Sequence, residues 1–232
     1  MTRFITCCFC LLTVMASWAQ NTTHIGAEVA YSNDFFKISD PAGRLTQPDI
    51  NSALWGVNIR RTFNKKVFLE TGIYARAYKV GLAFDHEFGS SGTDRTGYLV
   101  PLRAGIRLPI LKGAVTLCPV AGVTFGVTDE GYGGKVEGTR QWDGVETIRY
   151  SYTVQYPSQV FALFQAGAGI DIRLWPKTLL CLSTNFYGGI SKIMMQRIEY
   201  VAGAGMPNKA TQHTNGGFYT VGVGFKYEVN WF

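Results

Sequence analysis

The feature that most constrains this chain is a strict alternation of apolar residues with small or charged ones. In its clearest segment, every second residue from Val160 to Leu174 is apolar, and Asp171 and Arg173 lie in the opposite phase. Successive side chains of a β-strand point to opposite faces of the sheet, so a period of two predicts strands. Eight segments follow this pattern: residues 25–32, 55–60, 67–76, 98–108, 115–126, 160–174, 180–187 and 219–231.

The second face of these segments favours a membrane barrel over a soluble sandwich. It mixes glycines with charges, which suits a narrow lumen that packs small residues beside ion pairs, and segments of about ten residues can cross a bilayer at a tilt. Charged residues are only 16% of the chain, against about 25% in ordinary soluble domains. We therefore predict an all-β fold, an eight-stranded antiparallel up-and-down transmembrane β-barrel.

The connections between the segments alternate in length. The long ones are residues 36–52, 80–97, 128–159 and 191–215, and the short ones are residues 64–66, 109–113 and 175–177. Long outer loops and short periplasmic turns are typical of outer-membrane barrels. An even number of strands also closes the sheet, so that no backbone edge meets lipid.

The N-terminal residues predict export. Arg3 precedes an apolar run over residues 4–16, and Ser17-Trp18-Ala19 places small residues at a cleavage site. We expect residues 1–19 to be a cleaved signal peptide and residues 20–232 to form an outer-membrane β-barrel domain. The expected location is the bacterial outer membrane.

Three strand sequences carry a resemblance to a known family. They are Tyr98-Leu99-Val100-Pro101-Leu102, residues 120–126 and residues 164–170. These strands are similar to those of the PorT-like outer-membrane β-barrel family. The resemblance implies one eight-stranded barrel, broadly OmpX-like or OmpA-like in size, and no shared catalytic residues. Such barrels usually end in Phe; here Phe232 lies out of the apolar phase, and we expect Trp231 to act as the terminal aromatic residue.

The inward phase of the strands carries many charges. The acidic residues are Glu28, Glu70, Asp171 and Glu228, and the basic residues are Arg60, Arg76, Arg103, Arg107, Arg173 and Lys226. The lumen of an eight-stranded barrel is just wide enough for side chains to fill it, and buried charges must pair. One interpretation is therefore a salt-bridged plug. The alternative is a narrow ion path whose surplus of bases favours anions.

The longest outer connection contains a predicted hairpin over residues 135–156. Asp143-Gly144 is a strong two-residue turn signal, and centring the hairpin there pairs Trp142 with Val145 and Arg140 with Thr147. Apolar residues alternate along its second strand: Ile148, Tyr150, Tyr152, Val154 and Tyr156. We expect a ribbon that projects beyond the membrane and exposes Trp142 and these tyrosines to a partner.

Two cysteines lie beyond the predicted signal peptide, Cys118 and Cys181. One strand separates their strands, so they should lie about two spacings of ~4.8 Å apart. A disulfide spans no more than about 7 Å between Cα atoms. We therefore predict two free thiols.

Motifs for chemistry are sparse. His24, His86 and His213 are far apart in the sequence, and the chain has neither a Gly-x-Ser-x-Gly elbow nor a Walker lysine. The net charge is +6 without a run of Lys and Arg, so nucleic acid is not an expected partner. We expect no enzyme activity, no cofactor and no metal.

The sequence thus predicts a monomeric, non-enzymatic protein of the outer membrane. Its partners would be the lipid bilayer and a protein that meets the outer loops. Two alternatives stay open at this point. One is a small pore or transporter, and the other is an exported, soluble lipocalin-like barrel that binds an apolar ligand and would turn its apolar face inward.

Overall fold

The structure, a computed structural model, describes residues 21–229 except 86, 129–130 and 143–145. The predicted signal peptide, the predicted turn at Asp143-Gly144 and the C-terminal Trp231-Phe232 lie outside the described residues. Within the described part of the chain, no helix is long and apolar enough to cross a membrane.

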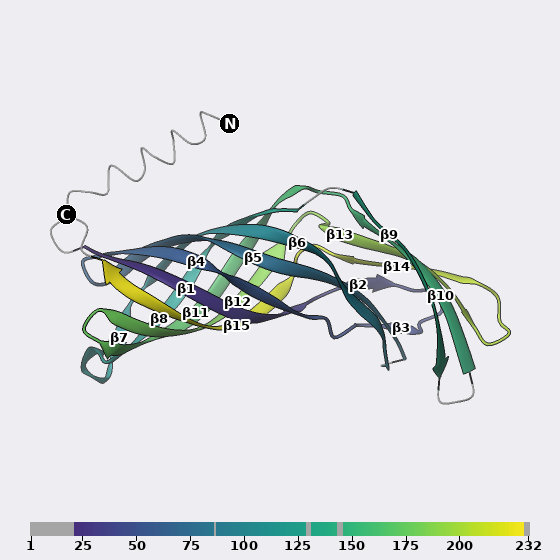
Figure 1. The fold of residues 1–232 in the computed structure, drawn as a ribbon, viewed down its shortest axis with the longest axis horizontal. Coiled ribbons are helices and arrows are strands. Elements are labelled where there is room, and N and C mark those ends of the chain that lie inside the picture. The colour runs from purple at the N-terminus through teal and green to yellow at the C-terminus, as the bar shows by residue number, and fades with distance from the viewer. Residues whose placement is uncertain (1–20, 86, 129–130, 143–145, 230–232) are drawn as a thin grey trace.

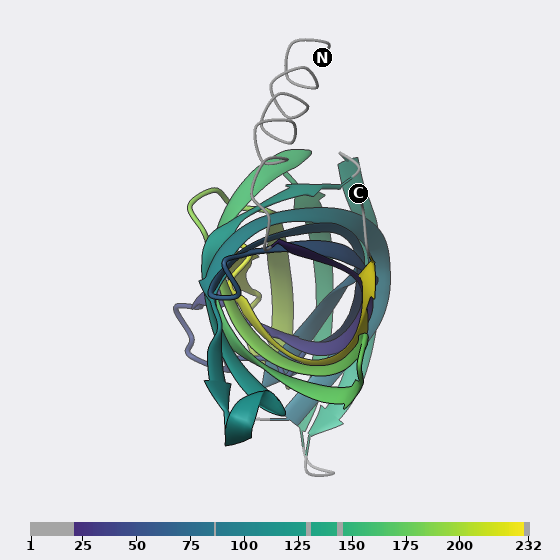
Figure 2. The same ribbon diagram turned by 90° about the vertical axis from the view of Figure 1, so that its left-hand side faces the viewer.

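Eight antiparallel strands form a closed barrel. They are β1 (Thr22–Asp34), β4 (Asn51–Phe63), β5 (Val67–Phe84), β6 (Glu87–Ile106), β8 (Val115–Val127), β11 (Val160–Trp175), β12 (Thr178–Gly189) and β15 (Phe218–Val229). Each strand pairs with the next one along the chain, and β15 pairs with β1 to close the ring (Figure 2). The predicted fold class, an all-β, eight-stranded antiparallel up-and-down barrel, is confirmed.

The apolar phase of the barrel strands points outward. Trp55 and Val57 on β4 are 61% and 58% exposed, whereas Asn58 and Arg60 on the same strand are buried in the lumen. A soluble lipocalin-like barrel would have the reverse arrangement. That alternative is therefore wrong for this chain.

The turns at one end of the barrel are short, as predicted. Residues 64–66 join β4 to β5. Asn64 and Lys65 have φ of 49° and 58°, the left-handed backbone of a tight hairpin turn. Between β6 and β8 lie only β7 (Leu108–Ile110) and the 3-10 turn η2 (Leu111–Gly113). The start of β1 and the end of β15 lie at this same end of the barrel (Figure 1).

The long connections at the other end are folded, which corrects the expectation of loops. They contain β2 (Lys37–Ser39), β3 (Leu45–Thr46), β9 (Gly131–Trp142), β10 (Glu146–Tyr156), β13 (Met194–Ala202) and β14 (Asn208–Thr214). Five of these strands form a second sheet in the order β2-β14-β13-β10-β9, here called the outer sheet (Figure 1). Residues 80–97 are not a loop either, because β5 and β6 continue as one long hairpin.

A hydrophobic core, here called the outer core, lies between the outer sheet and the end of β5 farthest from the short turns. The inward residues of β5 are polar at Glu70, Tyr74 and Arg76, and they become apolar at Val80 and Leu82. The residues that form this outer core are Phe36, Leu45, Ile50, Val80, Leu82, Phe84, Ile148, Tyr152, Val154, Tyr156, Met194, Ile198, Tyr200 and Ala210. The middle of the barrel lumen is therefore polar, whereas the outer part of the molecule is apolar inside. Between them, buried apolar residues such as Leu54, Leu99 and Leu163 cluster inside the outer end of the barrel.

The outward face of the barrel can be tested with a single charge. Val57→Arg should lower the free energy of unfolding in a bilayer by about 2–4 kcal/mol, the cost of Arg at the midplane of such barrels. Thr211→Arg, at an exposed position of β14, should change it by less than about 0.5 kcal/mol. Urea unfolding in phosphatidylcholine vesicles, followed by heat-dependent gel mobility, measures both. Equal losses would mean that Val57 does not face lipid.

Candidate functional site

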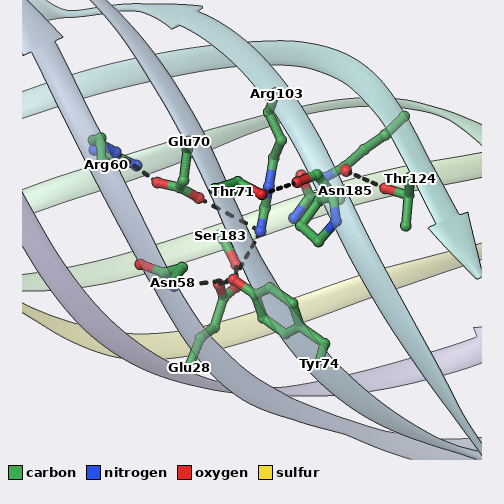
Figure 3. A network of polar contacts seen from close by, with 12 residues as sticks. Glu28, Asn58, Arg60, Glu70, Thr71, Tyr74, Arg103, Thr124, Ser183 and Asn185 are labelled. Atoms are coloured by element: carbon green, nitrogen blue, oxygen red, sulfur yellow. Dashed lines mark hydrogen bonds and ion pairs between the residues drawn. The ribbon is translucent and has the colours of Figure 1, made fainter. Parts of the chain in front are cut away.

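The centre of the lumen is an ion-pair network around Glu70 (Figure 3). Its Oε2 accepts hydrogen bonds from Arg60 Nε at 2.6 Å and from Lys226 Nζ at 2.5 Å. Arg103 Nη2 lies 3.4 Å from Oε1. These four buried side chains come from β5, β4, β15 and β6, so the network ties four strands together.

Arg60 extends the network across the lumen to β11. Its Nη1 donates to Asp171 Oδ2 at 2.6 Å, and its guanidinium lies over the ring of Phe68 at 4.2 Å. Cys118 Sγ donates to the same Asp171 oxygen at 3.3 Å. Cys118 and Cys181 are both buried and free, which confirms the prediction of two unbridged thiols.

Tyr74 forms a second branching point of the network (Figure 3). Its hydroxyl accepts from Arg103 Nη2 at 2.7 Å and Asn58 Nδ2 at 2.9 Å, and it donates to Glu28 Oε2 at 3.0 Å. Ser183 Oγ donates to the other Glu28 oxygen at 2.5 Å. The phenol thus uses its donor and both acceptor positions.

The charges of this network balance. Its carboxylates are Glu28, Glu70 and Asp171, and its cations are Arg60, Arg103 and Lys226. The surplus of bases expected from the sequence is therefore not found in the network. The void enclosed by these side chains is about 30 Å³, room for a water molecule or two. Side chains fill this level of the lumen.

The other charges expected in the lumen lie elsewhere. Arg76 is fully buried nearer the outer end, where Nη2 donates to Asp34 at 2.6 Å and the guanidinium lies 3.7 Å from the Phe218 ring centre. Arg173 is exposed, and Arg107 is half-buried. Both follow the inward phase, but they lie at the periplasmic rim, where the ring opens to water.

Glu228 lies at the same rim and is half-buried. Its Oε2 is 4.0 Å from Nε2 of the buried His24. This contact is separate from the network around Glu70. The predicted set of ten inward charges is therefore divided between the network, the Arg76 pair and the rim.

The uncharged members of the lumen were not predicted as site residues. Thr124 Oγ1 donates to Gln165 Oε1 at 2.9 Å, and Gln165 Nε2 donates to Asn185 Oδ1 at 2.9 Å (Figure 3). Asn58 and Tyr74 belong to this group too. All of them occupy the inward phase of the alternating segments, so the same pattern that selected the charges could have found them.

The projecting hairpin is present with a different register. Trp142 pairs with Glu146 and Arg140 with Ile148, one residue away from the predicted pairs with Val145 and Thr147. Three residues rather than two therefore connect β9 and β10. Asp143 and Gly144 lie outside the described residues, as does the side chain of Trp142.

The predicted exposed aromatic surface is wrong. Tyr152 and Tyr156 are each 3% exposed, and Tyr150 is half-buried. The alternation correctly placed them on one face of β10, but β10 pairs with β13, and this face packs on the apolar part of β5. The ribbon is one edge of a sheet that covers its own core.

Ionic contacts hold the outer connections together. Arg44 donates to Asp85 from Nε at 2.9 Å and to Glu146 from Nη2 at 2.8 Å. Tyr200 Oη donates to the Asp40 carboxylate at 2.9 Å. Burial and this carboxylate raise the pKa of Tyr200, and the hydrogen bonds from Arg44 lower the pKa of Glu146.

No group of three His, Cys, Asp or Glu side chains suited to a metal occurs among the described residues. No protein-family model matches the chain, and no curated protein matches it in sequence.

Solved structures resemble the chain in fold. The outer membrane protein OprG from Pseudomonas aeruginosa is 10% identical with a TM-score of 0.50, covering 92% of this chain and 98% of OprG. In fold, the chain is an outer-membrane β-barrel. Neisserial surface protein A is 9% identical with a TM-score of 0.49, covering 91% of this chain and 100% of its own. The N-terminal barrel domain of Pseudomonas aeruginosa OprF is 12% identical with a TM-score of 0.45, covering 90% and 100%.

Glu70 should be the most costly carboxylate to neutralise. Glu70→Gln leaves Arg60 and Lys226 buried without their shared partner, so it should lower the free energy of unfolding by about 3–5 kcal/mol. Glu199→Gln removes an exposed pair with Lys209 and should cost about 0.5 kcal/mol or less.

Equilibrium unfolding in detergent, followed by gel mobility, compares the two variants. Adding Lys226→Met to Glu70→Gln restores the charge balance and should recover part of the loss. Similar effects of Glu70→Gln and Glu199→Gln would contradict the central role of Glu70.

A fall in pH should destabilise the outer sheet before it destabilises the barrel. The pKa of Glu146 lies below the ordinary value of about 4.3 in the folded protein because Arg44 donates to its carboxylate. The stabilisation that the Arg44–Glu146 contact gives to the folded protein is therefore complete above about pH 4.3. It is lost as the pH falls through the lower pKa that Glu146 has in the folded protein. Hydrogen exchange of amides at the start of β10 should accelerate in acid relative to β12. In Glu146→Gln this acid dependence should disappear, and its persistence would argue against the contact.

Proposed function

We propose that this chain is a monomeric, non-enzymatic integral protein of the bacterial outer membrane that presents the outer sheet to a partner protein. Residues 1–19 would direct export as a signal peptide that is then cleaved. The observation that carries the proposal is the folding of the outer connections into a sheet with its own core. A surface ordered in advance binds a partner with a smaller loss of conformational entropy than a mobile loop does.

The outward side of this sheet offers the binding surface. Thr153, Arg197 and Thr211 lie side by side on β10, β13 and β14. Arg149 and Lys209 are exposed on the same side. Arginines and hydroxyl groups on this face suit hydrogen bonding to the polar rim of a partner, and Arg is enriched where interfaces gain most of their energy.

The filled lumen argues for an anchor rather than a pore. Conduction would need a continuous column of water, whereas the network around Glu70 encloses only about 30 Å³. The PorT-like assignment, and with it a role in secretion, stays a prediction from the strand patterns.

A photo-crosslinking amino acid at position 153 tests the proposal in cells of the source organism. We expect one discrete crosslinked protein, and we expect Arg149→Glu with Arg197→Glu to abolish it while heat-dependent gel mobility is unchanged. The same crosslinker at position 57, on the lipid face, is the matched control.

Purified protein in planar bilayers gives the second measurement. We expect no sustained conductance steps. Stable steps would favour the pore, and a crosslink at position 153 that survives both charge reversals would remove the outer sheet as the binding surface.

A further inference from the structure

An aromatic cluster marks the outer rim of the barrel on one side. Tyr219 lies at its centre, with ring centroids 6.3 Å from Tyr31, 6.0 Å from Phe35 and 6.3 Å from Phe186. The three surrounding rings are each about half exposed on the outward face. Aromatic side chains on this face of a barrel lie at the level of the lipid headgroups. The cluster therefore marks the outer membrane–water interface.

Basic residues lie where the chain leaves this rim. Lys37 begins β2 just after Phe35, and it pairs in register with His213 on β14. Lys192 precedes Ile193, whose N–H donates to the carbonyl of Thr214 at 2.9 Å. Both lysines are exposed, and His213 is half-buried. The three bases thus come from connections that follow β1, precede β15 and follow β12, neighbouring strands of the ring.

The charges of these residues act on one another. Burial and the positive charges of Lys192 and Lys37 lower the pKa of His213. Its imidazole keeps at least one N–H that can donate a hydrogen bond. Asp34 is adjacent in sequence, but it is buried and paired with Arg76. Asp49, before β4, accepts from Asn33 and lies within electrostatic range of Tyr219, but it is not among the charges that act on His213.

We propose that Lys37, Lys192 and His213 bind the phosphate of an anionic lipid in the outer leaflet, whose acyl chains lie against the cluster around Tyr219. The bases supply charge and hydrogen-bond donors at headgroup height. The exposed rings of the cluster around Tyr219 supply an apolar surface for the part of the acyl chains next to the headgroup. A free phosphate would use only the first of these features, whereas a phospholipid or a phosphorylated glycolipid uses both.

Native mass spectrometry of the full barrel from a neutral detergent tests this proposal. Dioleoyl phosphatidylglycerol should bind as a single adduct in preference to dioleoyl phosphatidylcholine. Lys37→Glu with Lys192→Glu should weaken that binding about twentyfold or more, since each lysine beside an anionic lipid contributes about fivefold. Lys65→Glu with Lys66→Glu, in the exposed turn at the opposite end of the barrel, makes the same charge change and should alter the binding less than about twofold.

Further variants and a competition with inorganic phosphate separate the possible outcomes. Lys37→Gln with Lys192→Gln repeats the test without charge reversal, and gel mobility verifies folding of every variant. Phe35→Ser should weaken lipid binding if the rings hold the chains. Equal binding of both lipids, an unchanged affinity in the lysine variants, or full displacement by millimolar inorganic phosphate with no effect of Phe35→Ser would each overturn the proposal.

Discussion

The narrowness of an eight-stranded ring is the constraint on which the rest of this structure depends. A ring of this size has no room for a hydrated lumen, and lipid on the outside offers no hydrogen bonds. Inward polar groups therefore depend on other side chains for their hydrogen bonds. Glu70 meets this requirement by accepting from Arg60 and Lys226 at once, and Tyr74 links the cations to Glu28.

Beyond the membrane, water replaces lipid around the strands, and their inward residues change from polar to apolar. Water now satisfies the outward residues, so apolar side chains can gather inside. β5 shows the change within one strand, from Glu70 and Arg76 to Leu82 and Phe84. The outer sheet supplies the second wall of this core, which explains why three separate connections fold into one sheet.

Much of the barrel could be predicted because alternation reports directly which residues share a face. It placed all eight strands and the two thiols. The same pattern does not report where a ring ends, so Arg173 was assigned to the lumen although it lies at the rim. Nor does it say what covers a face: Tyr152 and Tyr156 were assigned to one side of β10, but their burial depends on β5. Contacts such as Arg44 with Glu146, 102 residues apart, leave no local signal.

The continuity of β5 through both layers has a mechanical consequence. Its 18 residues span about 60 Å at ~3.4 Å per residue, and its outer part carries residues of the core on which the outer sheet packs. Gln212 Nε2 on β14 also donates to the carbonyl of Gly81 on β5, so packing and this hydrogen bond fix the outer sheet to the barrel. A pull on the outer sheet would pass into the barrel through the short segments that join β10 to β11, β12 to β13 and β14 to β15. The barrel strands would then transmit this tension into the bilayer.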